Sequence, residues 1–315
     1  MNRGASGGMG LGGIPLYNGR RSEENTMRAM IITDTGLELR DVPKPQPGPD
    51  QVLVRVHAAG LNRAELAMAA GHAHGSHGGA GAGIGLEWSG EVAEIGAGVT
   101  EFKPGDRVMA SGNGGYAEYA VTDRGRICPV PDSNMGWVQA ATLPIALQTM
   151  HDALATNGAL QAGQAVLIQG ASSGVGLMGL QIARELGAAI ILGASRNPAH
   201  RERLPEFGAT GAIDTGDEAW PGAVLDATGG EGVDLVVDMV SAAVSRGNLQ
   251  ATRVKGRIVN VGRLGGQMGP FDFDLHAARR ISYIGVTFRT RSVEEVREIN
   301  RRMRAALWPA LEAGR

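Results

Sequence analysis

The sequence predicts an α/β protein with two domains, one built mainly from antiparallel strands and one from a doubly wound parallel sheet. Its 315 residues exceed the roughly 100 to 200 of a usual single domain. Short strand-like runs with turn signals between them fill the first half of the chain, and strands alternate with helices beyond residue 165. Such alternation is typical of a parallel sheet, because each parallel pair needs a crossover that a helix can supply.

The first 26 residues are expected to lie outside both domains. Residues 1–26 are rich in glycine and lack the continuous apolar segment of a secretory signal, so they are interpreted as a flexible leader. From residue 27 to about 130, strand-like runs separated by turn residues indicate a compact, mainly antiparallel β domain. The expected strands are residues 28–33, 51–58, 90–95, 106–110 and 116–121, followed by a helical stretch over about 135–156.

Beyond residue 165 the pattern predicts a Rossmann-like domain. An apolar strand meets a glycine-rich turn and then an amphipathic helix, the unit from which doubly wound sheets are built. The expected elements are strand 165–169, helix 175–186, strand 188–192, helix 199–207, strands 233–239, 256–261 and 281–287, and a last helix over 292–311.

Composition and charge exclude several classes of function. The net charge of -2 gives no electrostatic reason to expect nucleic acid or an anionic membrane surface as a partner. The apolar-looking run 165–183 contains glycines, serines and glutamines, so it is interpreted as strand, turn and helix and not as a membrane span. The single cysteine, Cys128, excludes an internal disulfide and any site with several cysteines, and it fits a reducing cytoplasm.

The turn after the first strand of the second domain indicates a nucleotide site. It is composed of Gly170, Ala171, Ser172, Ser173, Gly174, Val175 and Gly176. The turn departs from the strict G-x-G-x-x-G form, yet small residues allow the backbone to approach a pyrophosphate, and the following helix offers free N–H groups with a positive dipole. An ordinary tight turn between a strand and a helix remains the alternative.

The end of the second strand favours NADP(H) over NAD(H). NAD sites place an acidic residue about 20 positions after the first glycine to bind the adenosine ribose, but this chain has Ser195 and Arg196 there. A hydroxyl and a guanidinium suit the 2′-phosphate of NADP(H), with His200 and Arg201 one turn further on as helpers. The alternative is that Arg196 is a solvated loop cation.

Several motifs in order across about 265 residues resemble the medium-chain dehydrogenase/reductase superfamily. The likeness is to its zinc-independent quinone oxidoreductase branch, which includes ζ-crystallin. The motifs are VRVHAAGLNRAE over residues 54–65, GLEWSGEV over 85–92, PGDRV over 104–108, GYAEY over 115–119, residues 143–149, the glycine turn, and GVTFRTRS over 285–292.

The resemblance implies a GroES-like catalytic domain over residues 27–145, joined by residues 291–315, and a Rossmann NADP(H)-binding domain over 146–290. Relatives continue past the last helix, so a closing segment is expected beyond Arg315. Relatives are often dimers that extend their sheets edge to edge, which makes the chain an expected homodimer with 281–287 as the candidate edge strand.

The same resemblance implies direct hydride transfer from the nicotinamide to a quinone or another conjugated carbonyl. The cofactor then carries the chemistry and the protein supplies orientation and a dry cleft. Asn62 would contact substrate or nicotinamide, although a loop-capping role for Asn62 stays open. For Arg63, a structural role as an ion-pair partner of Glu65 or Glu87 is equally open. Thr149 would pack near the nicotinamide ring, and the cofactor groove would include Val240, Gly262, Phe288 and Arg289.

No metal site is expected. Zinc-dependent relatives place a cysteine near Asn62, a histidine where Leu86 stands and four further cysteines elsewhere, and this chain has none of these. Three imidazoles, from His72, His74 and His77, could bind a divalent ion, but a glycine-rich loop fixes no geometry for one.

That histidine-containing stretch is instead expected to be a loop at the mouth of the cleft. Ala73 stands where relatives carry a tyrosine that contacts nicotinamide or substrate. Whether His72 or His74 takes over that contact is open.

The sequence therefore predicts a cytoplasmic NADPH-dependent oxidoreductase that acts on a small quinone or enone without a metal. Two alternatives remain: an enoyl-thioester reductase of the same superfamily, and a non-catalytic NADPH-binding protein.

Overall fold

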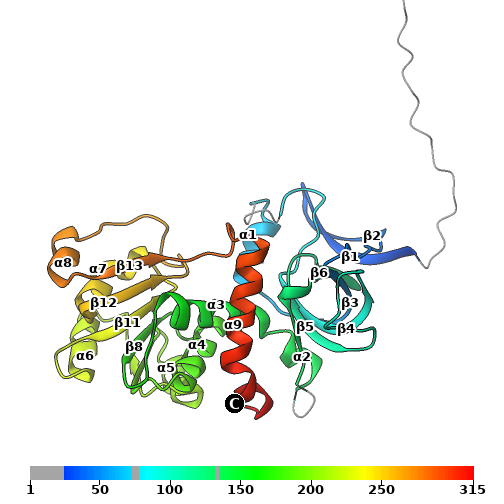
Figure 1. Ribbon diagram of the computed structural model, residues 1–315. Helices are drawn as coiled ribbons and strands as arrows, with labels where there is room; N and C mark the ends of the chain where they lie inside the picture. Colours follow the sequence, from blue (N-terminus) through cyan, green and yellow to red (C-terminus); the bar gives the residue numbers. More distant parts are fainter. Residues whose placement is uncertain (1–24, 73–77, 132–134) are drawn as a thin grey trace, which may run out of the picture.

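The computed structural model describes residues 25–72, 78–131 and 135–315. Two sheets lie on either side of a long central helix, one curled and antiparallel and the other parallel (Figure 1). The predicted fold class is confirmed. Residues 1–24 of the expected leader lie outside the described residues, and so do Ala73, His74 and His77.

The first domain contains all of the expected strands and two more. Five strands form an antiparallel sheet in the order β6-β3-β4-β5-β7, and β1 pairs with β2. Trp88 and the valines of neighbouring strands are buried inside the curl of the sheet. The strands are β1 (Thr26–Thr33), β2 (Gly36–Pro43), β3 (Gln51–Ala59), β4 (Glu87–Ile95), β5 (Arg107–Ser111), β6 (Tyr119–Asp123) and β7 (Ile127–Pro129), with helix α1 (Arg63–Ala69) after β3.

The second domain is a six-stranded parallel sheet in the order β10-β9-β8-β11-β12-β13. Its strands are β8 (Ala165–Gln169), β9 (Ile190–Ala194), β10 (Gly211–Ile213), β11 (Val233–Asp238), β12 (Thr252–Asn260) and β13 (Ser282–Gly285). Its helices are α4 (Gly174–Glu185), α5 (Pro198–Arg203), α6 (Trp220–Ala227), α7 (Ser245–Ala251) and α8 (Phe273–Arg279).

Alternate side chains of these strands pack against opposite helix layers. Ile168 and Val237 belong to a cluster with residues of α4, whereas Leu167 and Val236 belong to a second cluster with residues of α6 and α7. Both faces of the sheet are therefore covered, as the apolar composition of its strands requires.

Four elements of this domain were not predicted: β10, α6, α7 and α8. β10 is only three residues long, and Pro221 and Gly222 weaken the helical pattern of α6. Tertiary packing stabilises α6 and α7 instead, because a Cβ on Gly247 of α7 would lie 2.2 Å from the ring of Trp220. Such contacts leave no periodic signal in the sequence.

The expected helix over 135–156 is interrupted. It consists of α2 (Trp137–Ala140), α3 (Pro144–His151) and a π-helical turn (Asp152–Asn157). Pro144 begins α3, where its missing N–H does no harm.

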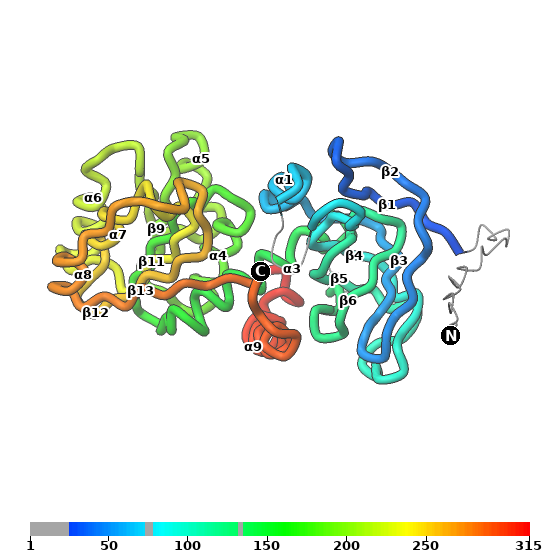
Figure 2. Tube along the Cα trace, turned by 90° about the horizontal axis from the view of Figure 1, so that it is seen from above, coloured from blue at the N-terminus to red at the C-terminus, as the bar shows by residue number. Residues whose placement is uncertain are grey.

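The last helix, α9 (Val293–Glu312), lies between the two sheets in both views (Figures 1 and 2). Ser292 caps it by accepting from the Glu295 N–H at 3.2 Å, and Glu295 accepts from the Ser292 N–H at 2.8 Å. Arg297 pairs with Asp123 at 2.6 Å and joins α9 to the β domain. The largest core cluster includes residues of both domains, namely Met109, Cys128, Leu147, Leu180, Val237 and Leu307 among others.

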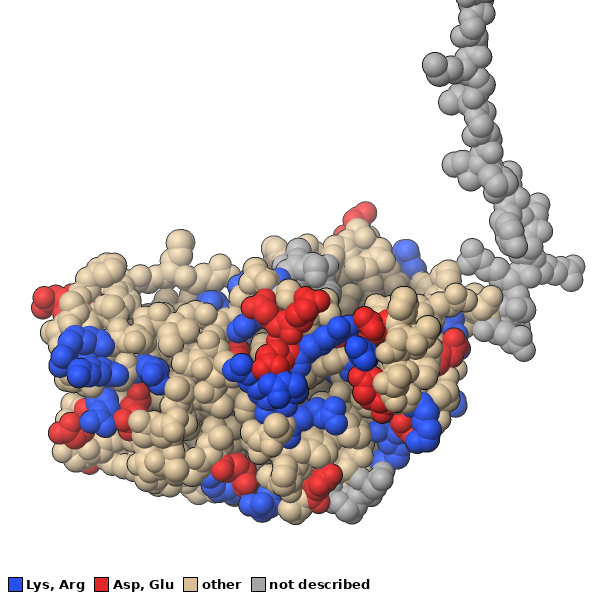
Figure 3. All heavy atoms as spheres, in the orientation of Figure 1, with Lys and Arg blue, Asp and Glu red and all other residues tan. Residues whose placement is uncertain are grey.

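Acidic and basic side chains lie next to one another over α9 (Figure 3). Arg301 and Arg302 both pair with Glu298, at 2.7 and 2.6 Å. No helix within the described ranges is both long and apolar enough to cross a membrane.

Candidate cofactor and substrate cleft

Most residues predicted to bind the cofactor directly follow the carboxyl ends of five neighbouring strands. Gly170 follows β8, Ser195 follows β9, and Val240, Gly262 and Phe288 come two or three residues after β11, β12 and β13. The carboxyl ends of parallel strands meet at one edge of a sheet, and the strand order reverses between β8 and β11 at that edge. Nucleotides bind in the crevice at such a reversal.

The glycine turn offers hydrogen-bond donors at this edge. Ser173 caps α4 by accepting from the Gly176 N–H at 3.1 Å, and its hydroxyl donates to the Gly170 carbonyl at 2.9 Å. The backbone N–H groups of Ser172, Gly174 and Val175 make no hydrogen bond to any residue that the structure describes. Together with the positive end of the α4 dipole, they fit a pyrophosphate.

Gly176 is required where the turn folds back on α4. A Cβ at this position would lie 2.6 Å from the Gly170 oxygen and 2.7 Å from the Ala171 Cα, both of which are backbone atoms. At Gly174, by contrast, a Cβ would meet nothing within 4 Å. Gly170 itself has φ +72°, a conformation that favours glycine.

Replacing Gly176 with Ala is expected to destabilise the protein by roughly 2 kcal/mol or more and to weaken dinucleotide binding, because the turn must move to accommodate the methyl group. Gly174→Ala is the matched control and should leave stability unchanged or slightly raised, since alanine favours helix. Thermal unfolding and nucleotide titration measure both effects. Equal stability of the two variants would contradict this account of the turn.

The turns after β8 and β9 meet at the expected ribose end of the crevice. The hydroxyl oxygens of Ser195 and Ser172 lie 3.2 Å apart, and Ser195 is buried. Arg196 and His200 are exposed, and Arg196 makes no hydrogen bond or ion pair with the described residues. Arg201, expected as a helper, is already occupied: it donates to the Ser195 carbonyl at 2.9 Å and pairs with Asp214 at 2.8 Å.

The loops after β11 and β12 are fixed by Asp238, the last residue of β11. Its buried carboxylate accepts from the N–H groups of Val240 at 2.8 Å and Ser241 at 2.9 Å, and burial raises its pKa. The Gly262 N–H donates to the Asp238 carbonyl at 3.1 Å, and a Cβ on Gly262 would lie 2.7 Å from the Met239 oxygen. The loops after β11 and β12 are therefore held against each other at the edge of the sheet.

The segment after β13 completes that edge. Phe288 is half-buried, and Arg289 is exposed with its Nε 3.2 Å from the Thr287 hydroxyl. Arg291 pairs with the buried Asp152 at 3.0 Å, which joins this segment to the π-helical turn after α3.

Asn62 and Thr149 belong to the β-domain side and to α3. Asn62 is half-buried at the start of α1, and its side-chain Nδ2 donates to Glu87 Oε1 at 2.9 Å. The other carboxylate oxygen of Glu87 accepts from the Ile145 N–H at 2.9 Å. Ile145 and Thr149 are four residues apart on α3 and so share a face of the helix. The half-buried Thr149 hydroxyl makes no hydrogen bond to a described residue.

A buried acidic cluster next to Asn62 was missed from the sequence. Glu65 accepts from the N–H groups of Asn62 and Leu86, each at 2.7 Å, and from the Tyr116 hydroxyl. Neither Glu65 nor Glu87 pairs with Arg63 among the described residues, so the structure does not show the alternative ion pair of Arg63. The one sequence signal was Asn62 three residues before Glu65, the spacing of a capping box.

The pKa of Glu87 is raised to about 7, chiefly by burial. Hydrogen bonds from Ile145 and Asn62 lower this pKa in part, and the negative charge of the neighbouring Glu65 raises it further. A carboxyl group whose pKa is raised by folding stabilises the protein most when it is protonated. That contribution is present below the unfolded pKa and is lost as the pH rises through about 7.

The free energy of unfolding of the wild type, measured against that of Glu87→Gln at the same pH, should therefore fall by about 3 kcal/mol between pH 4.5 and pH 8. Denaturant unfolding of both proteins across that range measures the difference. Glu94→Gln, which changes an exposed carboxylate on the same strand, is the matched control and should run parallel to the wild type. A constant difference for Glu87→Gln would contradict the raised pKa.

Leu86, which the resemblance aligns with a zinc-ligand histidine of zinc-dependent relatives, is buried with Ile32, Met68 and Ile84. In the part of the chain that the structure describes, no three His, Cys, Asp or Glu side chains are grouped to hold a metal ion. Cys128 is buried, and burial raises the pKa of its thiol to about 12.

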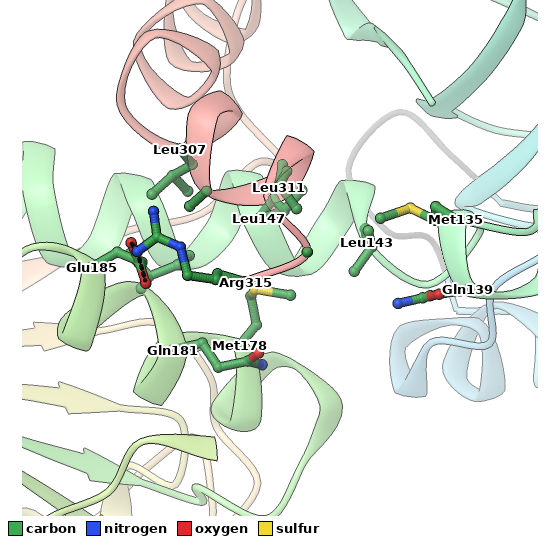
Figure 4. A pocket seen from close by; sticks show the side chains of 13 residues that line it. Met135, Gln139, Leu143, Leu147, Met178, Gln181, Glu185, Leu307, Leu311 and Arg315 are labelled. Atoms are coloured by element: carbon green, nitrogen blue, oxygen red, sulfur yellow. Dashed lines mark hydrogen bonds and ion pairs between the residues drawn. The ribbon is translucent and has the colours of Figure 1, made fainter. Parts of the chain in front are cut away.

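A separate pocket of about 200 Å³ lies between α3, α4 and α9 (Figure 4). Leu143, Leu147, Met178 and Leu307 line it, and the ion pair of Arg315 with Glu185 at 3.0 Å lies at its border. None of the predicted cofactor or substrate residues lines this pocket, so it is distinct from the candidate site.

Known proteins share this architecture. Residues 48–132 match the family described as the alcohol dehydrogenase GroES-like domain, and residues 174–304 match zinc-binding dehydrogenase. Human quinone oxidoreductase is 30% identical over 308 residues, which cover 92% of this chain and 88% of the human protein. A mycobacterial protein solved with NADPH superposes with a TM-score of 0.77 at 28% identity, over 90% of this chain and 89% of that one.

Part of the chain is also similar to a much larger enzyme. A phenolphthiocerol/phthiocerol polyketide synthase from Mycobacterium tuberculosis is 34% identical over 227 residues, which are 72% of this chain and 10% of the synthase.

The similarity to the human enzyme extends over both domains, which a shared nucleotide fold alone would not produce. The chain is a medium-chain dehydrogenase/reductase. Within that superfamily it belongs to the quinone oxidoreductase branch and is an oxidoreductase, which confirms the resemblance found in the motifs.

Proposed function

We propose that the protein is an NADPH-dependent reductase that transfers hydride to a quinone or another conjugated carbonyl without a metal. The observation that carries this proposal is the edge of the parallel sheet, where N–H groups of the glycine turn lie beside Ser195 and Arg196; neither these N–H groups nor the Arg196 side chain has a partner among the described residues. The mycobacterial structure that contains NADPH supports the choice of cofactor.

The nicotinamide would supply the hydride, and the chain's own residues would bind and orient the reactants. Gly170 to Gly176 and Ser195 with Arg196 would hold the phosphates, whereas Val240, Gly262, Phe288 and Arg289 would border the groove. One N–H of the Asn62 amide is occupied by Glu87, which leaves its second N–H free to donate to a substrate carbonyl oxygen. The reduced product can take its proton from water.

An enoyl-thioester reductase is the second candidate, because the matched polyketide synthase shares 34% identity with most of this chain. Turnover with a panel of quinones and enoyl thioesters separates the two. The third alternative, a non-catalytic NADPH-binding protein, does not agree with membership of an oxidoreductase family.

NADPH should bind at least several times more tightly than NADH. A charge-assisted contact from Arg196 to the 2′-phosphate contributes about 1.5 to 3 kcal/mol before solvent screening, which reduces it at an exposed position. Arg196→Ala should narrow the difference mainly by weakening NADPH, as calorimetric titration of both nucleotides would show.

Arg203→Ala is the matched control for that titration, because Arg203 is an exposed arginine of α5 that already pairs with Glu206 at 3.1 Å. Its removal should leave the nucleotide preference unchanged. Equal affinities of the wild type for NADPH and NADH, or a preference untouched by Arg196→Ala, would refute the cofactor assignment.

Asn62→Ala should lower kcat/KM for quinones roughly tenfold while NADPH affinity stays the same, since one hydrogen bond to the substrate is lost. Steady-state kinetics with the quinone panel and NADPH titration measure the two quantities. An unchanged kcat/KM would show that Asn62 only shapes the loop before α1.

We further propose a cytoplasmic homodimer joined through β13. This strand lies at the edge of the parallel sheet, and the exposed rings of Tyr283 on β13 and of Phe273 both pack against Phe271. Unpaired edges with apolar surroundings favour pairing with a second chain. A monomer in sedimentation equilibrium at micromolar concentration would exclude this arrangement.

A further inference from the structure

We propose that Glu87 is a positioning residue: its carboxylate fixes the amide of Asn62 and aligns α3, and it thereby sets the geometry in which the substrate is bound. The role of Asn62 toward substrate rests on the proposed function. The hydrogen bonds that define the position of the Asn62 side chain are observed independently of that function.

The two oxygens of Glu87 bridge separate parts of the molecule. Glu87 is the first residue of β4 and only 4% exposed. Oε1 accepts from Asn62 Nδ2 before α1, and Oε2 accepts from the Ile145 N–H at the start of α3, both at 2.9 Å. Because a carboxylate only accepts, Asn62 must turn its NH₂ group toward Glu87, which determines the orientation of its amide.

The backbone around the carboxylate leaves it little freedom. A Cβ on Gly60 would lie 2.5 Å from both Glu87 Oε1 and the Ala141 oxygen. The carboxylate thus fills the space that any larger residue at position 60 would take. Its place is determined by β4, by the loop before α1 and by the segment before α3 together.

A second carboxylate holds the backbone of the same asparagine. Glu65, also 4% exposed, accepts from the Asn62 N–H, while Glu87 accepts from the Asn62 side chain. The titratable groups facing Glu87 are Glu65 from α1 and Tyr116, whose hydroxyl donates to Glu65. No cation pairs with Glu87 among the described residues. Asn62 is therefore held by two acids, neither of which forms an ion pair with a cation in the described part of the chain.

Protonation of Glu87 would disturb this arrangement. The carboxylate accepts two N–H groups, but a carboxylic acid presents one O–H that must face a donor. Burial raises the pKa of Glu87 to about 7, so the change falls within the working range of an enzyme. In the wild type, kcat/KM should therefore rise as the pH passes through about 7.

Glu87→Gln tests the bridge, because the amide of glutamine has one acceptor and one donor and can satisfy only one of the two N–H groups. It should lower kcat/KM for quinones roughly tenfold, leave the Kd for NADPH unchanged and abolish the rise near pH 7. Glu87→Asp keeps the charge but shortens the side chain. It should therefore lower kcat/KM, and kcat/KM should still rise with pH.

Ser89→Ala is the matched control. Ser89 lies two residues along the same strand, is fully buried and donates to the Trp137 carbonyl at 2.6 Å, without contacting Asn62. Its loss should lower stability and leave kcat/KM within twofold. A tenfold loss in Ser89→Ala as well would show that any weakening of β4 impairs the enzyme and would overturn the inference.

A double-mutant cycle tests whether Glu87 acts through Asn62. Adding Glu87→Gln to Asn62→Ala should cause no further loss of kcat/KM beyond twofold. If kcat/KM of the double variant were instead about a hundredfold below that of the wild type, Glu87 would act independently of Asn62, and the proposal would be overturned.

A measurement without turnover keeps this inference separate from the proposed function. The side-chain NH₂ resonances of Asn62, assigned by their loss in Asn62→Ala, should shift with pH around 7 in the wild type and not in Glu87→Gln. If no quinone or enone is reduced, the proposed function fails, and these resonances alone decide the inference. Asn62 signals that ignore both pH and Glu87→Gln would overturn it.

Discussion

The parallel pairing of β8 with its neighbours is the constraint on which the candidate cofactor site depends. Parallel strands place all of their carboxyl ends at one edge, so residues from Gly170 to Arg289 come together although more than a hundred positions separate them. Asp238 then fixes the loops after β11 and β12 against each other. Asn62 belongs to the β-domain side, and α3 connects that side with the parallel-sheet domain through packing on α4.

Much of this arrangement could be predicted from the sequence, because its strands and helices repeat apolar residues at their own periods. The turn at Gly170 and the end of β9 at Ser195 follow from local residue types. The roles of Glu87 and Arg201 do not, since their partners Asn62, Ile145 and Asp214 are brought close only by tertiary folding. β2 was missed because none of its residues is buried and its apolar alternation, Leu37 and Leu39, covers only two apolar positions.

The acidic cluster illustrates a conflict between stability and function. An ionised carboxylate with no cation beside it is costly to bury. Glu65 and Glu87 are nevertheless both buried, and their oxygens accept from backbone and amide N–H groups around Asn62. A neutral side chain in place of Glu87 would make the fold more stable at alkaline pH and leave the Asn62 amide less firmly oriented, so the arrangement favours a defined orientation of Asn62 over stability.

The apolar core that includes Met109 and Cys128 of one domain with Val237 and Leu307 of the other has a further consequence for how the molecule unfolds. Two domains with separate cores melt independently, whereas a shared core couples them into one cooperative unit. Separating the halves would expose the inner faces of α3 and α9 to water. The two domains therefore gain and lose their structure together, and partial unfolding that would leave an intact nucleotide domain alone in solution is disfavoured.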